Sequence, residues 1–143
     1  MSAEDRLAII ETIARYSHAW GEGDTDGWID VFTPDAVFEV SGRGSSGPHI
    51  RHEGRDALYA WAKGRHASRG DNEGIRPMNT GTVFEELSDT TARTRTMLVQ
   101  TQLAGDQRRG PALNVSGIYT DDWRKTPDGW RLAHRRLQLD VER

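Results

Sequence analysis

The C-terminal part of the chain decides the fold, and its clearest stretch is Ala112–Lys125, ALNVSGIYTDDWRK, followed by Trp130–Val141, WRLAHRRLQLDV. Both stretches intersperse apolar and aromatic residues with polar ones, as strands do. Between them lies Pro127-Asp128-Gly129, where the proline presets φ and the glycine accepts a positive φ. The sequence therefore predicts two long antiparallel strands joined by a tight turn.

Upstream of this hairpin the same pattern predicts two more long strands, Ile75–Leu87 and Thr91–Leu103, joined at Ser88-Asp89. The first third of the chain differs, because its apolar residues recur at helical spacing. It predicts helices over residues 3–20, 26–32 and 56–65, with a turn at 33–35 and a short strand over 36–40. Helices first and antiparallel strands afterwards indicate one α+β domain over residues 1–143.

Composition excludes several classes of protein. The chain has no cysteine, which excludes disulfides and thiolate metal sites, and its net charge of −3 argues against nucleic acid as a partner. No stretch approaches the ~20 apolar residues that cross a bilayer, and no signal peptide is visible at the N-terminus. His49 and His52 lie in a Gly/Ser loop without a third ligand, so no metal is expected there. We expect a cytoplasmic protein that does not contact membranes.

A set of local strings occurs in a characteristic order along nearly the whole chain. They are Ala14-Arg15-Tyr16, Gly23-Asp24, Trp28, Val31-Phe32-Thr33-Pro34-Asp35-Ala36-Val37-Phe38, Glu53-Gly54-Arg55-Asp56-Ala57-Leu58, Gly117-Ile118-Tyr119-Thr120-Asp121, Gly129-Trp130-Arg131-Leu132 and Arg135. Together they resemble the SnoaL-like family of the nuclear-transport-factor-2-like superfamily. The resemblance implies a cone-shaped, curved, mostly antiparallel sheet wrapped around three N-terminal helices, with a pocket at its open end. Members include cofactor-free dehydratases, isomerases and cyclases, and also non-catalytic binding domains.

The resemblance also implies a set of catalytic positions. Dehydratase-like members use a tyrosine on the first helix, an aspartate shortly after it and a histidine on the first long strand. Tyr16 matches the tyrosine, and its alternative is a core residue. Gly21 occupies the aspartate position, and the histidine position falls near Arg76-Pro77, so the usual dyad is absent.

Other polar residues remain as candidates for a site. His66 is the candidate general base, unless it is simply exposed in its loop, and Asn79 offers an amide to a ligand oxygen. Arg135 either stabilises negative charge on a substrate, as in several family members, or pairs on the surface with Asp121 or Asp122. Tyr16, His66 and Arg135 are thus the catalytic candidates, and the substrate-binding candidates are Trp20, Trp28, Phe32 and Asn79.

These residues lead to one functional hypothesis and one alternative. The hypothesis is a cofactor-free lyase, isomerase or cyclase that acts by proton transfer on a small, hydrophobic, cyclic, oxygenated molecule in a conical pocket. The alternative is a non-catalytic domain of the same fold that binds a small ligand or acts as a dimeric interaction module. A homodimer is expected in either case, through the open sheet face around Thr91–Leu103.

Overall fold

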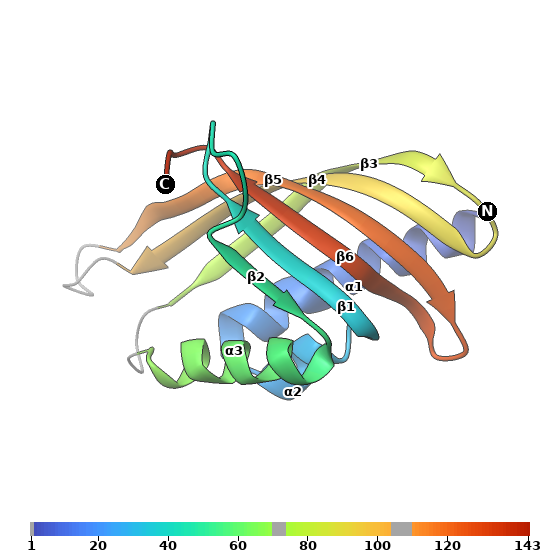
Figure 1. The fold of residues 1–143 in the computed structure, drawn as a ribbon, viewed down its shortest axis with the longest axis horizontal. Coiled ribbons are helices and arrows are strands. Elements are labelled where there is room, and N and C mark those ends of the chain that lie inside the picture. Colours follow the sequence, from blue (N-terminus) through green and yellow to red (C-terminus); the bar gives the residue numbers. More distant parts are fainter. Residues whose placement is uncertain (1, 70–73, 104–109) are drawn as a thin grey trace.

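A computed structural model describes residues 2–69, 74–103 and 110–143. Three helices and six strands follow one another along the described chain (Figure 1). The helices are α1 (Ala3–Glu22), α2 (Thr25–Ile29) and α3 (Arg55–Ala67). The strands are β1 (Phe32–Ser41), β2 (Ile50–Glu53), β3 (Arg76–Leu87), β4 (Thr91–Leu103), β5 (Pro111–Thr126) and β6 (Gly129–Leu139).

The six strands form one curved sheet in the order β2-β1-β6-β5-β4-β3. Neighbouring strands are antiparallel except for β1 and β6, which are parallel. All three helices lie on one side of this sheet, which we call its inner face, and the opposite outer face carries no helix (Figure 1). The predicted α+β class and the four long strands are confirmed.

Helix α1 begins at Ala3 as predicted and ends at Glu22, two residues beyond the predicted end. Ser2 caps it by accepting a hydrogen bond from the Asp5 backbone N–H, and the Asp5 side chain accepts one from the Ser2 backbone in return. At the other end Gly23 takes a left-handed conformation with φ of 72°, which suits glycine. The face that carries Ile9, Ile13 and Tyr16 is buried against the sheet.

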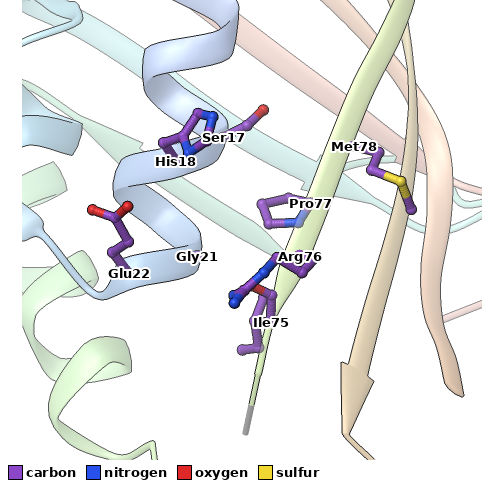
Figure 2. A pocket seen from close by; sticks show the side chains of 8 residues that line it. All are labelled: Ser17, His18, Gly21, Glu22, Ile75, Arg76, Pro77 and Met78. Atoms are coloured by element: carbon purple, nitrogen blue, oxygen red, sulfur yellow. The ribbon is translucent and has the colours of Figure 1, made fainter. Parts of the chain in front are cut away.

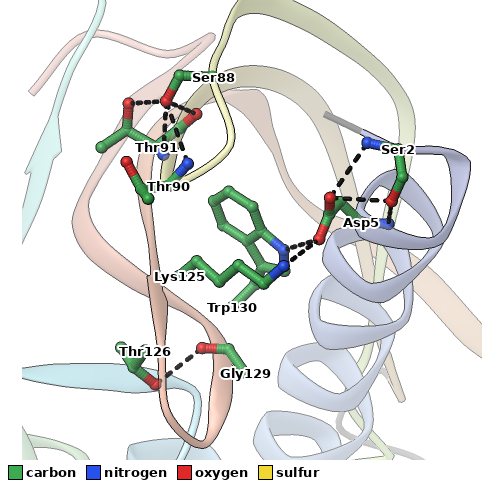
Figure 3. A network of polar contacts seen from close by, with 9 residues as sticks. All are labelled: Ser2, Asp5, Ser88, Thr90, Thr91, Lys125, Thr126, Gly129 and Trp130. Carbon is green, nitrogen blue, oxygen red and sulfur yellow. Dashed lines mark hydrogen bonds and ion pairs between the residues drawn. The ribbon is translucent and has the colours of Figure 1, made fainter.

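The β5–β6 hairpin is held to the first turn of α1 through Asp5 (Figure 3). The indole N–H of Trp130 donates to Asp5 Oδ1 at 2.8 Å, and Lys125 Nζ lies 3.0 Å from the same oxygen. These hydrogen bonds, led by that from Trp130, hold the pKa of Asp5 well below its ordinary value. Contacts between residues more than 100 positions apart in the sequence thus fix where the helix lies on the sheet.

The region between α2 and α3 differs from the prediction. Helix α2 ends at Ile29 rather than at Phe32, because the Leu132 backbone N–H bonds to Val31 O at 2.8 Å and draws this segment into the sheet. The expected turn at Thr33-Pro34-Asp35 is part of β1, although the pairing of β1 with β6 shifts between Phe32 and Val37. Strand β2 was not predicted, because its four residues are mostly polar and only backbone pairing with β1 reveals it.

The core lies between the three helices and the inner face of the sheet, and large side chains dominate it. Trp28, Phe32, Leu58 and Leu132 are almost completely buried, and the rings of Trp28 and Phe32 are 4.6 Å apart. No helix in the described parts of the chain is both long and apolar enough to cross a membrane.

Candidate functional site

An ion pair lies inside this core. Arg135 on β6 and Asp121 on β5 face each other across the strands, both with no exposed surface, and Arg135 Nε lies 3.1 Å from Asp121 Oδ1. That contact is not aligned as a hydrogen bond, and neither Asp121 oxygen accepts one from the described residues. Arg135 Nη1 is likewise buried without a partner. A buried pair with unused hydrogen-bonding capacity is costly to the fold.

A β-bulge turns Arg135 into the core. Leu132 points inward, and strict alternation from it would turn position 134 inward and position 135 outward. The pairing of β5 with β6 shifts between Asp122 and Trp123, which leaves Ala133 as an extra residue in β6. Arg135 therefore points inward, whereas His134 points outward, where its Nε2 lies 3.3 Å from Glu39.

Three further side chains surround the Arg135 guanidinium, and we call the set the Arg135 cluster: Tyr16, Asn79, Tyr119, Asp121 and Arg135. The guanidinium carbon lies 4.1 Å from the ring centre of Tyr16 and 3.4 Å from that of Tyr119. Arg135 Nη2 donates to Asn79 Oδ1 at 3.0 Å. The cluster joins α1, β3, β5 and β6, so only the folded chain assembles it.

Burial shifts the acid–base properties of this cluster. It raises the pKa of Asp121 from 3.8 to about 6, although the charge of Arg135 opposes the shift. Burial also raises the pKa of Tyr119 well above its ordinary value. For Arg135 the effect of burial is outweighed by the nearby Asp121, so its pKa is raised and it stays charged. A buried carboxyl with a pKa near neutrality beside a fixed cation is typical of catalytic sites.

A crevice lies between α1 and β3 (Figure 2). It has a volume of about 410 Å³ and is lined by Ser17, His18, Gly21, Glu22, Ile75, Arg76, Pro77 and Met78. The Ser17 hydroxyl points toward β3 and accepts a hydrogen bond from Asn79 Nδ2 at 2.7 Å. A chain of polar contacts, Ser17 to Asn79 to Arg135 to Asp121, thus runs from the crevice into the core.

The two positions at which the family would hold its dyad meet in this crevice. A Cβ atom added to Gly21 would lie 2.8 Å from the backbone oxygen of Ile75 and 3.3 Å from Pro77 Cδ. The helix and the strand therefore approach so closely that glycine fits and a larger residue would need them to separate. The dyad positions are adjacent, but they carry neither an aspartate nor a histidine.

The aromatic candidates belong to the packed core. Trp28 and Phe32 are fully buried, and neither lines the crevice. Trp20 is half-buried and stacks on Trp61 with ring centres 5.4 Å apart. The rings of Trp28 on α2 and Phe32 on β1 pack directly against each other. They therefore fill space in which the sequence predicted an apolar pocket.

His66 lies apart from the Arg135 cluster. Its Nδ1 is 2.7 Å from Thr25 Oγ1, and its ring lies 4.6 Å from that of Trp20. Burial lowers its pKa to about 4, which makes it neutral but a weak base at pH 7. It makes no hydrogen bond, ion pair or ring contact with the cluster. No group of three potential metal ligands occurs among the described residues.

Sequence reasoning missed two residues of the cluster, Tyr119 and Asp121. They are two positions apart on β5 and therefore point to the same face, which was the available signal. Asp121 was considered only as a surface partner of Arg135. Asp121 does pair with Arg135, but the bulge at Ala133 places the ion pair in the core.

Comparisons with known proteins identify relatives of the whole chain. Residues 1–136 match the family described as the SnoaL-like domain. The uncharacterized protein Rv2910c of Mycobacterium tuberculosis is 29% identical over 132 residues, which cover 92% of this chain and 82% of that protein.

Solved structures share the fold. A Mycobacterium tuberculosis protein of unknown function is 29% identical with a TM-score of 0.79, covering 94% of this chain and 71% of that one. A provisionally assigned aromatic ring hydroxylase from Novosphingobium aromaticivorans is 27% identical with a TM-score of 0.79, covering 97% and 91%. From the same organism, a nuclear-transport-factor-2-like protein with a cystatin-like fold is 24% identical with a TM-score of 0.77, covering 95% and 82%.

Proposed function

Because the chain belongs to the family of SnoaL-like domains, we propose that it is a lyase or isomerase that moves a proton on a small, mainly apolar, oxygen-bearing molecule. The observation that carries this proposal is the Asp121 carboxyl, which is fully buried beside Arg135 and has its pKa raised to about 6. A general base works best when its pKa lies near the working pH. The resemblance to a provisionally assigned aromatic ring hydroxylase agrees with a cyclic ligand.

In this mechanism Asp121 takes the role that sequence reasoning gave to His66. Its carboxylate removes a proton from a carbon next to a carbonyl, and the electron pair of that C–H bond forms a C=C bond. The carbonyl oxygen then becomes negatively charged. Where another C=C bond is conjugated with this enolate, the carbonyl re-forms as the proton returns to the far carbon of that bond, which completes an isomerisation. Where the neighbouring carbon carries a leaving group, the carbonyl re-forms as that group departs with its bonding electron pair, which completes an elimination.

Arg135 and Tyr16 stabilise the negative oxygen. Arg135 is aligned by Asp121 at Nε and by Asn79 at Nη2, which leaves Nη1 free for a substrate oxygen. A preformed charge in a dry site stabilises a developing oxyanion without reorganisation of solvent. Asn79 is the half-buried member of the cluster and is bonded to Ser17 in the crevice. We therefore place the approach of the substrate at the crevice and Asn79.

The proposal is tested by proton exchange in deuterated buffer. Incubation with cyclohexanone or 2-tetralone, followed by NMR, reports deuterium uptake next to the carbonyl. Asp121→Asn should lower the rate by about 10²–10⁴-fold, the usual contribution of a general base. The exchange rate of the wild type should fall as the pH drops through about 6, because Asp121 becomes protonated. Asp122→Asn, which changes the neighbouring outward-facing acid, is the matched control and should keep the rate.

A non-catalytic ligand-binding domain is the second candidate. It is favoured by the contact of Gly21 with Ile75 and Pro77, which leaves the dyad positions without a base. In that case 2-tetralone raises the Tm by binding the folded state but exchanges no protons. Exchange that is equal in wild type and Asp121→Asn, or absent with both ketones, contradicts the enzymatic proposal.

A further inference from the structure

A second pocket lies between the first half of α1 and the turn that joins β5 to β6. It has a volume of about 320 Å³, and the charged residues that line it are Glu11, Arg15, Asp30, Asp128 and Arg131. It shares no residue with the crevice or with the Arg135 cluster. Its volume is at the lower end of the range of small-molecule sites, about 300–1,000 Å³. We call it the hairpin pocket.

The turn holds the guanidinium of Arg131 in place. Arg131 Nη1 donates to the Trp130 backbone oxygen at 3.0 Å. A Cβ atom added to Gly129 would lie 3.2 Å from the same Nη1, so the guanidinium lies directly against the turn. In the parts of the chain that the structure describes, no group accepts a hydrogen bond from its Nε or Nη2, and it makes no ion pair. These two nitrogens have the spacing that binds a carboxylate through two parallel hydrogen bonds.

Two aspartates of the hairpin pocket also have unused charge. Asp30 is the C-terminal cap of α2, and Asp128 precedes Gly129 in the turn. Neither side chain makes a hydrogen bond or an ion pair with any described residue. Glu11 and Arg15 instead pair with each other, with Arg15 Nη2 3.5 Å from Glu11 Oε1. The hairpin pocket therefore offers one cation and two anions to a ligand.

The floor of the hairpin pocket is fixed before any ligand binds. Trp130 lines the pocket, and it is only 2% exposed. Its indole N–H is bonded to Asp5 in the first turn of α1 (Figure 3). The helix and the hairpin therefore keep their relative positions in the free protein. A preformed site loses little conformational freedom on binding, which favours affinity for a small ligand.

We infer that the hairpin pocket binds a free α-amino acid. The carboxylate of the ligand binds Nε and Nη2 of Arg131, and its ammonium group lies next to Asp30 and Asp128. A simple amine would be repelled by the guanidinium, and a simple carboxylate by the two aspartates, whereas a zwitterion is attracted by both signs. An apolar ligand would bury these charges without a partner, which is costly. This inference is independent of the proposed catalytic function.

NMR titration of the ¹⁵N-labelled full chain with L-phenylalanine tests the inference. At about pH 6 the amino group of the ligand is protonated and both aspartates are ionised. The backbone amide signals of Asp30, Gly129 and Arg131 should shift and saturate at about 1–10 mM ligand. Phenylalaninamide lacks the carboxylate and N-acetylphenylalanine lacks the ammonium group. Each should bind about tenfold to a hundredfold more weakly, because each loses a charged hydrogen-bonding group.

Two variants assign the charges of the ligand to their partners. Arg131→Gln should weaken binding of L-phenylalanine by about tenfold or more, but it should not weaken binding of phenylalaninamide, which has no carboxylate. The double variant Asp30→Asn and Asp128→Asn should weaken binding of L-phenylalanine but not of N-acetylphenylalanine. The NMR spectrum of each variant also shows whether the fold is kept.

Arg124→Gln is the matched control. It removes the same charge from the residue that pairs in register with Arg131 on β5, but Arg124 is bonded to Asp35 and does not line the hairpin pocket. It should leave the affinity for L-phenylalanine nearly unchanged. Shifts that do not saturate, or that saturate only outside the pocket, overturn the inference. Equal affinity for phenylalaninamide, or an Arg131→Gln variant that binds L-phenylalanine like the wild type, also overturns it.

Discussion

Replacing Asp121 by asparagine should change how the stability of the protein depends on pH. Asp121 is fully buried, and burial raises its pKa from 3.8 to about 6 against the opposing charge of Arg135. Asparagine has nearly the same shape and does not titrate. The difference in unfolding free energy between wild type and variant therefore isolates the titration of this one carboxyl.

The sign follows from proton linkage. Between pH 3.8 and about 6 the folded wild type holds a proton on Asp121 that the unfolded chain has lost. The contribution of Asp121 to the unfolding free energy is therefore greatest below the unfolded pKa and is lost as the pH rises through the folded pKa. The two pKa values, 3.8 and about 6, are about two units apart. At about 1.4 kcal/mol for each unit, the unfolding free energy of the wild type should fall by about 3 kcal/mol relative to that of Asp121→Asn.

Urea denaturation of both proteins at intervals from about pH 4 to about pH 8 measures this difference. Asp122→Asn is the control: burial raises the pKa of Asp122, but hydrogen bonds from Arg93 and Arg136 outweigh it and the pKa is lowered. The difference in unfolding free energy between Asp122→Asn and wild type should be nearly constant above pH 3.8 and should change only at lower pH. The reasoning is wrong if the difference in unfolding free energy between wild type and Asp121→Asn does not depend on pH, or if rising pH stabilises the wild type relative to the variant. Either result would mean that the attraction of Arg135 outweighs the effect of burial on Asp121.

Three further predictions concern other parts of the molecule. Asp5→Asn should lower the Tm at pH 7 in thermal circular dichroism, and the difference should narrow as the pH falls below 3.8, because the hydrogen bonds from Trp130 and its neighbours favour the ionised carboxylate. Gly21→Ala should cost about 1–3 kcal/mol in urea denaturation, because its Cβ would lie 2.8 Å from the Ile75 oxygen; unchanged stability would contradict that close approach. The NMR titration of His66 should have its midpoint at about 4, and a midpoint near 6.5 would mean that the ring is solvated.

The sequence predicted α1 and the four long strands, but it did not predict β2 or the first residues of β1. Local signals were sufficient for α1, because the Ser2 cap, the apolar face and the Gly23 stop are all within the helix or next to it. They were also sufficient for the long strands. They failed at β2 and at the start of β1, since those segments are extended through backbone pairing with distant strands. Local composition carries little information about such pairing.

Several site predictions remain open, and the structure shows why sequence could not complete them. Tyr16 and Asn79 were named and do lie beside Arg135, because each occupies an inward position of its own element. His66 was chosen for its residue type, and only the packing of α3 against Trp20 and Thr25 shows that it lies elsewhere. The roles of these side chains in binding or catalysis stay predictions.

By itself the sequence determined the α+β class, the order of helices and strands, and a tyrosine on the buried face of the first helix. Those properties depend on residue periodicity and caps, which act over a few positions along the chain. Only the tertiary structure decided that Arg135 and Asp121 are buried together. One extra residue at Ala133 reverses the alternation of β6, and a register shift of this kind is set by pairing between strands rather than by the residues of either strand alone.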